Sequence, residues 1–359
     1  VTLGSVSLEN RVVMAPLTRM RADDEGVPSP LAAEYYAQRA SAGLIISEAT
    51  QISELGKGYP ATPGIYSNQQ LAAWRTITDA VHVKGSKIFS QLWQVGRISH
   101  SSLHPNDGLP IAPSPIKPTG KVYTASWTLA EYETPRAITL DEIQTLKTQY
   151  VHAATQAKAA GFDGIELHAA NGYLLDQFLQ DRTNQRTDAY GGLFENRIRF
   201  PLELFGAVRK AYTGVLGIRI SASDWIKGGW TPEETAEFAK RLKPLGCDFV
   251  HISSGGISPK QKIAIGPNYQ VPFAKIVKDH SGLPTMTVGL ITEPQQAEAI
   301  LQAGDADLIA LARAFLYKPR WGWEAAAALG ATVKANERYW RCLPREAQSV
   351  FGDVKVGQR

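Results

Sequence analysis

Three side chains that could bind or protonate a carbonyl compound lie within six residues, His168-Ala169-Ala170-Asn171-Gly172-Tyr173. They directly follow the strand-like run Gly164–Leu167. Buried polar groups cost free energy unless they are paired, and parallel-sheet barrels present such groups to substrate at their strand ends. His168, Asn171 and Tyr173 are therefore candidate catalytic residues.

Polar residues also occur at the ends of, or inside, other strand-like runs. Thr18 follows the first run, Gln91 ends the third, and Arg219 lies inside the fifth, 216–220. An unpaired charge inside a strand would be strongly unfavourable. Arg219 therefore requires an anionic or electron-rich partner within the fold.

The last two strand-like runs are followed by features suited to a phosphate. Gly289 allows the backbone to approach a ligand closely, and Ala312-Arg313 offers backbone N–H groups and a guanidinium. Barrels frequently bind phosphate after their seventh and eighth strands. This pattern favours an organic cofactor with a phosphate group, whose negative charge Arg219 could offset.

Other chemistries fit the sequence less well. No strand candidate ends in the lysine that a Schiff-base aldolase would need, and the seven histidines lack metal-ligand spacing. The two cysteines, Cys247 and Cys342, are too few for a four-cysteine cluster. We therefore expect no metal site.

The elements that position these residues alternate between short β-branched runs and amphipathic helices, which is typical of parallel sheets with crossover helices. Eight such runs, with no glycine-rich dinucleotide turn after the first, favour an α/β fold of the (β/α)8 TIM-barrel type over an open doubly wound sheet. The strand candidates are Val12–Met14, Leu44–Ser47, Lys87–Gln91, Gly164–Leu167, Leu216–Ser221, Phe249–Ser253, Thr285–Val288 and Leu308–Leu311.

Helix starts are marked by capping boxes, in which a hydroxyl and a carboxylate or amide satisfy free helix N–H groups. The helix after Thr139 should cover the sheet with a face of apolar and small residues. The four capping boxes are Ser67…Gln70, Thr139…Glu142, Thr231…Glu234 and Thr292…Gln295, and that face comprises Ile143, Leu146, Tyr150, Ala153, Ala154 and Ala157.

We expect residues 1–359 to form a single domain, since no linker or low-complexity tract divides the chain. The proline-rich stretch 94–136, after the third strand, reads as an elaborated loop over the barrel mouth with a short hairpin around Lys121–Thr128. Residues before Asn10 should form a β-element that closes the barrel floor. Residues 332–359 read as a C-terminal tail.

Composition limits the function classes. A net charge of +4 without a basic run gives no indication of nucleic-acid binding, and no run of 18 apolar residues indicates a membrane span. The first ten residues lack the pattern of a signal peptide. We therefore expect a cytoplasmic protein, either a monomer or a homo-oligomer, that binds small molecules.

The sequence resembles the Old Yellow Enzyme family of FMN-dependent ene reductases over essentially its whole length. The strings that carry the resemblance occur in the family's order. They are Asn10–Arg19, Gln91–Trp93, His168–Gly192, Arg219–Ser221, Val288-Gly289 and the region of Arg313.

The resemblance implies that FMN is bound without a covalent link. By this resemblance, Thr18 would lie near the flavin C4 carbonyl, Gln91 at the pyrimidine edge and Arg219 at N1 and O2. The phosphate would be held by Gly289, Ala312 and Arg313. The full set of implied flavin-binding residues is Pro16, Thr18, Ala49, Gln91, Arg219, Gly289, Ala312 and Arg313.

The resemblance also implies the reaction. NADPH or NADH reduces FMN, a hydride then passes from flavin N5 to Cβ of an activated alkene (an α,β-unsaturated carbonyl or a nitroalkene), and Tyr173 gives a proton to Cα. His168 and Asn171 would bind the substrate oxygen, and Tyr59 and Trp93 would line the pocket. Two alternatives are a dienoyl-CoA-type reductase and a non-catalytic barrel that binds a phosphate ligand.

The sequence departs from the family pattern in places. Asn171 stands where many members have a second histidine, and Ala312 where glycine is usual. The half before about Tyr212 resembles the original branch, whereas the half from Leu216 resembles the thermophile-type branch. We therefore predict a mosaic with its junction near the fifth strand. Two interpretations of the tail residues Arg338–Arg341 stay open: they reach a pocket of this or a neighbouring subunit, or they form a surface tail.

Overall fold

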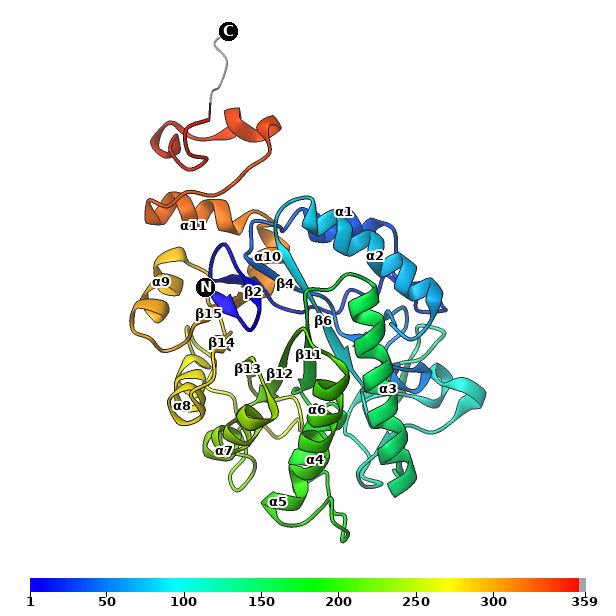
Figure 1. The fold of residues 1–359 in the computed structure, drawn as a ribbon. Helices are drawn as coiled ribbons and strands as arrows, with labels where there is room; N and C mark the ends of the chain where they lie inside the picture. The colour runs from blue at the N-terminus through cyan, green and yellow to red at the C-terminus, as the bar shows by residue number, and fades with distance from the viewer. Residues whose placement is uncertain (355–359) are drawn as a thin grey trace.

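In the computed structural model, which describes residues 1–354, eight parallel strands form a closed barrel. Each pairs in parallel with the next, and β6 pairs with β11 to close the ring. Figure 1 shows these strands at the centre of a ring of helices. In barrel order the strands are β3 (Val12–Met14), β4 (Leu44–Ile46), β6 (Lys87–Trp93), β11 (Gly164–Ala169), β12 (Val215–Ser221), β13 (Phe249–Ser253), β14 (Thr285–Thr287) and β15 (Leu308–Leu311).

The helices cover the outside of the barrel (Figure 1). They are α1 (Leu31–Ala37), α2 (Asn68–His82), α3 (Leu140–Ala159), α4 (Leu174–Leu179), α5 (Phe194–Arg197), α6 (Arg199–Ala211), α7 (Pro232–Leu242), α8 (Val271–Ser281), α9 (Pro294–Gln302), α10 (Arg313–Tyr317) and α11 (Trp321–Leu329). No helix among residues 1–354 is long and apolar enough to cross a membrane.

The barrel prediction is confirmed, and three strands match it residue for residue. Two of the predicted strands were too short at their C-terminal ends, and both contribute residues to the site. Strand β6 continues past Gln91 to Trp93, and β11 continues through His168 to Ala169. Gln91 and His168 therefore lie inside strands instead of ending or following them. The prediction ended one strand at the polar Gln91 and the other before the polar His168, whereas the backbones beyond these points stay paired with neighbouring strands.

Three of the four capping boxes and the buried face of α3 are confirmed. The fourth was wrong by one residue. Glu293, not Thr292, caps α9, and its partner is Gln296. Pro294 takes the first helical position, where no N–H is needed, and so moves the start of the helix by one.

The predicted element at the barrel floor is a hairpin of β1 (Thr2–Leu3) and β2 (Val6–Ser7). Leu3 and Leu8 are buried against the inward side chains at that end of the barrel, including Phe89 and Phe249. The floor is therefore filled with apolar side chains.

The remaining short elements lie mainly at the barrel mouth and near the end of the chain. The predicted hairpin in the 94–136 loop consists of β8 (Lys121–Tyr123) and β9 (Leu129–Glu131). Strand β7 (Ile111–Ala112) pairs in parallel with β10 (Arg136–Ala137) and so joins the middle of the loop to its C-terminal end, while β5 (Thr50–Gln51) extends the sheet beside the end of β6. Short 3-10 turns occur at Glu54–Gly56, Ser101–Leu103, Pro105–Asp107, Lys243–Leu245, Glu337–Cys342 and Arg345–Ala347.

The segment after α11 packs against α11 in a small apolar cluster beside the barrel (Figure 1). Tyr339 of the predicted tail packs edge-on against Trp323 of α11, and Arg320 lies over both rings. The tail thus contacts its own chain up to residue 354, and residues 355–359 lie outside the described part. Contact with a neighbouring subunit and the single-domain assignment stay predictions.

Candidate active site at the barrel mouth

His168 lies near the end of β11 as a buried, neutral hydrogen-bond donor. Its Nδ1 accepts the backbone N–H of Ala170 at 3.3 Å, so in the neutral ring Nε2 carries the hydrogen. Burial holds the pKa of His168 well below its usual value, and the positive charge of Arg219 lowers it further. His168 can therefore donate a hydrogen bond through Nε2 without carrying charge.

Asn171 is fixed in a tight turn directly after β11. Its φ of 58° is left-handed, a region that asparagine tolerates better than most residues. Its backbone N–H donates to Ser221 Oγ at 2.8 Å, and its Nδ2 donates to Ser253 Oγ at 3.2 Å. Two neighbouring strands therefore orient the Asn171 amide, whose Nδ2 carries a second hydrogen.

Gly172 is required in the same turn. Its φ is 85°, and a Cβ at this position would lie 2.4 Å from the carbonyl oxygen of Gly256. Its N–H donates to the buried carboxyl of Asp176 at 2.8 Å. The close approach of the two loops sets where Asn171 and Tyr173 emerge from the barrel.

Four of the predicted residues form one aromatic group at the mouth. The Trp93 ring stacks on Tyr59 at 6.0 Å and on His168 at 6.1 Å, and Tyr173 meets its edge at 4.7 Å. The hydroxyls of Tyr59 and Tyr173 are 3.1 Å apart. Ala49 belongs to the same apolar cluster. Side chains from four separate segments of the chain thus surround one place.

Tyr173 is held as a neutral phenol. Burial raises its pKa well above the usual value, and the neighbouring Tyr59 raises it further. A protonated phenol hydrogen-bonded to a second hydroxyl can give up a proton and regain one from that neighbour. Tyr173 thus has the protonation state and the hydrogen-bond neighbour that a general acid needs.

Below the mouth, a buried polar network crosses the barrel interior. Gln91 Nε2 donates to Glu166 Oε1 at 2.7 Å, and His251 Nδ1 donates to Glu166 Oε2 at 2.7 Å. Arg219 lies between them on β12, opposite His251 in the strand pairing. Burial lowers the pKa of Arg219, and the negative charge of Glu166 opposes this shift. Glu166 is thus a protein anion for Arg219, in addition to any ligand.

The predicted phosphate residues gather after β14 and β15. Gly289 has a φ of 116°, and a Cβ there would crowd Gln270 and Tyr269 at about 3 Å. Arg313 begins α10, directly after Ala312, and is exposed. Both Arg313 and Arg219 lower the pKa of Tyr269, whose burial raises it. Tyr269 therefore lies in the field of the two guanidiniums.

The residues after β3 are tied to those after β4. Pro16 is buried, and the backbone N–H of Arg19, next to the exposed Thr18, donates to Glu48 Oε2 at 2.9 Å. Glu48 directly precedes Ala49. This bond fastens the Thr18 loop to the segment that carries Ala49, although Thr18 itself lies outside the aromatic group.

Sequence reasoning missed Glu166, His251, Ser253 and Tyr269. The first three alternate with apolar residues in β11 and β13, so their side chains face the barrel interior. A polar residue at every second position of a buried strand was the signal that could have identified them.

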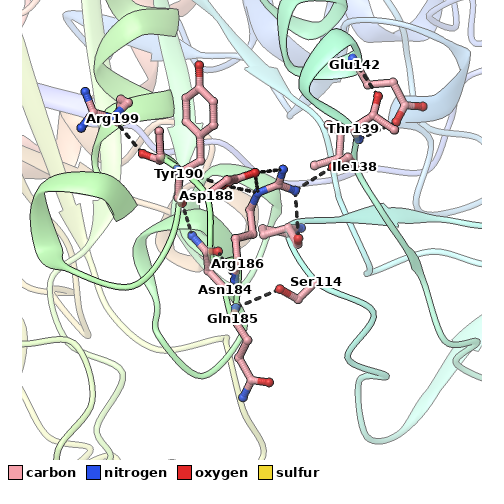
Figure 2. Close-up of polar contacts among 12 residues, drawn as sticks. Ser114, Ile138, Thr139, Glu142, Asn184, Gln185, Arg186, Asp188, Tyr190 and Arg199 are labelled. Atoms are coloured by element: carbon pink, nitrogen blue, oxygen red, sulfur yellow. Dashed lines mark hydrogen bonds and ion pairs between the residues drawn. The ribbon is translucent and has the colours of Figure 1, made fainter.

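The 174–192 string that follows Tyr173 holds the proline-rich loop in place (Figure 2). Arg186 Nη1 donates to the carbonyls of Ile138, at 2.6 Å, and Pro113, at 3.2 Å, and its guanidinium pairs with Asp188. The N–H of Gln185 donates to Ser114 Oγ at 2.8 Å. This unusual string thus fastens the middle of the 94–136 loop and the residues just after it.

Two cavities on the protein surface are not lined by His168, Asn171 or Tyr173. A cavity of about 730 Å³ is lined by residues such as Ile52, Tyr66 and His152, and one of about 660 Å³ lies between α1 and the tail residues Arg338 and Tyr339. Within residues 1–354, no group of three or more His, Cys, Asp or Glu side chains could hold a metal ion. The convergence of polar groups, not the hollow volume, locates the site.

Residues 1–330 match the NADH:flavin oxidoreductase / NADH oxidase family. An NADPH dehydrogenase of Geobacillus sp. (strain WCH70) is 40% identical, with 95% of this chain and 97% of that protein aligned. The 12-oxophytodienoate reductase 1 of Oryza sativa subsp. japonica is 40% identical over 88% of this chain and 82% of its own length.

Solved structures agree. Morphinone reductase in complex with tetrahydroNAD superposes with a TM-score of 0.80 at 39% identity, covering 92% of this chain and 90% of its own. The Old Yellow Enzyme homologue of Zymomonas mobilis gives 0.82 at 36% identity, covering 98% of each. These matches run along the whole chain and do not separate its halves, so the mosaic stays a prediction. With these neighbours and the barrel-mouth site, the chain belongs to the Old Yellow Enzyme family of FMN- and NAD(P)H-dependent oxidoreductases.

Proposed function

We propose that this enzyme is an ene reductase for α,β-unsaturated carbonyls and nitroalkenes. The observation that carries the proposal is a neutral histidine and a protonated tyrosine packed on Trp93, with an oriented asparagine amide in the turn between them. Two of these groups donate hydrogen bonds and one donates a proton, which is what a developing enolate or nitronate needs.

The residues beneath the mouth fit FMN. Arg219 Nε is buried without a hydrogen-bond partner among residues 1–354, and an orphaned buried donor calls for a ligand acceptor. Gln91 could bond the ring edge. A Cβ at position 289 would collide with Gln270 and Tyr269, so only glycine fits there, and its bare backbone can approach a ligand. Pro16, Thr18 and Ala49 would line the ring, while Ala312 and Arg313 would join Gly289 at the phosphate.

When bound, FMN supplies the hydride that it has accepted from NADPH or NADH. The protein's part is to hold the substrate oxygen with His168 Nε2 and Asn171 Nδ2, where donors act most strongly on the charge of the transition state. Loss of one such donor typically costs about 2.7–4 kcal/mol. Tyr173 then donates its hydroxyl proton to Cα, and Tyr59 lies within hydrogen-bond distance to restore it.

The alternatives are weaker. A non-catalytic barrel does not agree with membership of an enzyme family. A dienoyl-CoA-type reductase with an iron–sulfur cluster would need more thiolates than Cys247, which is buried, and Cys342, which is exposed. We keep the cytoplasm as the proposed location.

Separate measurement of the two half-reactions tests the proposal. The enzyme is reduced anaerobically with NADPH or NADH and then mixed with 2-cyclohexenone or a nitroalkene. Tyr173→Phe should slow the second half-reaction by roughly 10²–10⁴-fold and leave the first nearly intact. An equal loss in both halves would remove Tyr173 from the proton-donor role. A wild-type enzyme that is not reoxidised by either alkene would refute the proposed substrates.

The oxygen-binding residues have a test of their own. A phenol should bind over the flavin as a mimic of the enolate and shift the visible spectrum. His168→Ala combined with Asn171→Ala should abolish this binding. Unchanged phenol affinity would contradict their role.

A further inference from the structure

Glu166 is a buried carboxylate that touches neither the aromatic group nor the mouth, yet it bonds a residue that the cofactor site uses. Both Glu166 and His251 have side chains that are 0% exposed, and Gln91 is 1% exposed. Each Glu166 oxygen receives one hydrogen bond at 2.7 Å, from Gln91 Nε2 and from His251 Nδ1. A buried charge with two such bonds indicates a built arrangement, because an unpaired one would be costly.

The first consequence concerns the direction of the Gln91 amide. An ionised carboxylate only accepts hydrogen bonds, so the Gln91 nitrogen must face Glu166. The amide oxygen is then the end that remains for a ligand, and it can accept an N–H from the cofactor ring. Without Glu166, the two ends of this amide could exchange, because they are alike in size and shape.

The second consequence concerns charge. Arg219 lies on β12, between the strands of Glu166 and His251, and Glu166 is the foremost negative group acting on it. Burial keeps the His251 ring neutral by lowering its pKa. The interior beneath the cofactor thus holds one positive and one negative charge, instead of a lone positive one.

We propose that Glu166 is a positioning residue for the cofactor: it fixes the Gln91 amide with its oxygen toward the ring, and it offsets part of the Arg219 charge. This role rests on the proposed function. It makes two separate statements, one about affinity for oxidised FMN and one about the balance between oxidised and reduced cofactor.

Glu166→Gln keeps the shape and removes the charge. With a neutral amide at 166, Gln91 loses its preferred direction, and oxidised FMN should bind about tenfold more weakly. Arg219 is then no longer offset, so the reduced cofactor, which carries negative charge, is favoured. A tenfold change in the ratio of reduced to oxidised affinity corresponds to about 30 mV for a two-electron couple, and the midpoint potential should rise by about that amount.

The experiment uses the full chain. FMN affinity is measured by titration of the apoprotein with fluorescence detection, the midpoint potential by equilibrium reduction against a reference dye, and folding by urea denaturation. The matched control is Asp224→Asn, which neutralises a carboxyl group that is 1% exposed in the loop after β12. It should change neither the affinity nor the potential.

The proposal is overturned if folded Glu166→Gln keeps the wild-type affinity and potential, or if Asp224→Asn shifts both as much. Should Glu166→Gln not fold, His251→Phe, which keeps a ring but has no N–H donor, replaces it. This variant keeps the charge but removes one anchor of the carboxylate, so FMN should bind more weakly while the potential stays nearly constant. Unchanged affinity in that variant would overturn the proposal. A wild-type protein that binds no FMN would refute the proposed function itself, before any variant is compared.

Discussion

Arg186→Ala should loosen the proline-rich loop at the barrel mouth (Figure 2). The Arg186 guanidinium is mostly buried and bonds the carbonyls of Pro113 and Ile138. Each buried acceptor left without its donor costs about 1–3 kcal/mol, so the two together cost roughly 2–6 kcal/mol. The pair with the partly exposed Asp188 adds at most about 1 kcal/mol.

The assay for this prediction is urea denaturation combined with limited proteolysis. Arg199→Ala is the matched control, because Arg199 also bonds a backbone carbonyl, at 2.8 Å, but is exposed. It should change stability by no more than about 0.5 kcal/mol. Arg186→Ala should in addition open cleavage sites within 94–136. Equal stability of the two variants, with no new cleavage, would refute the idea that Arg186 fastens the loop.

Gly172→Ala should lose roughly 2–5 kcal/mol and most activity, because its left-handed backbone and the clash of its Cβ with Gly256 both add cost. In contrast, Gly206→Ala, in open space on α6, should be neutral or stabilising, and denaturation of both variants checks this. Burial raises the pKa of Asp176 to about 7, so the folded state holds a proton that the unfolded chain releases above about pH 4. The contribution of Asp176 to stability should then be complete below about pH 4 and fall by on the order of 4 kcal/mol as the pH rises through about 7. Asp176→Asn should flatten this profile in urea titrations, and an unchanged slope would assign it to other groups. Thr139→Ala, which removes the N-cap of α3, should cost about 1 kcal/mol, and Thr139→Ser should restore it in thermal melts.

The architecture was predictable because its signals are local and repeated. Buried parallel strands appear as short apolar runs, and a helix start needs only a capping residue and its partner three positions later. The residues of Phe249–Ser253 and Leu308–Leu311 matched the predicted strands fully. Bounds shifted where a second local effect competed, as Pro294 did at the start of α9.

The site was predictable only in part, because much of it depends on contacts between strands. His168, Asn171 and Tyr173 are close in sequence and were identified together. The link between Gln91 and Glu166 spans 75 positions, and it exists only because β6 and β11 close the barrel. No local pattern contains that closure, so Glu166 appeared as one polar residue within an apolar run.

The hairpin of β1 and β2 closes one end of the barrel and leaves the mouth as the end open to ligands. With Leu3 and Leu8 packed into the opposite end, the proposed function would have nicotinamide and alkene arrive and depart along the same path at the mouth. Under that function the two would not occupy the site together. Turnover should therefore follow a ping-pong mechanism in which product leaves before the next substrate binds. Double-reciprocal plots should give parallel lines, and an excess of nicotinamide or of alkene should inhibit the enzyme.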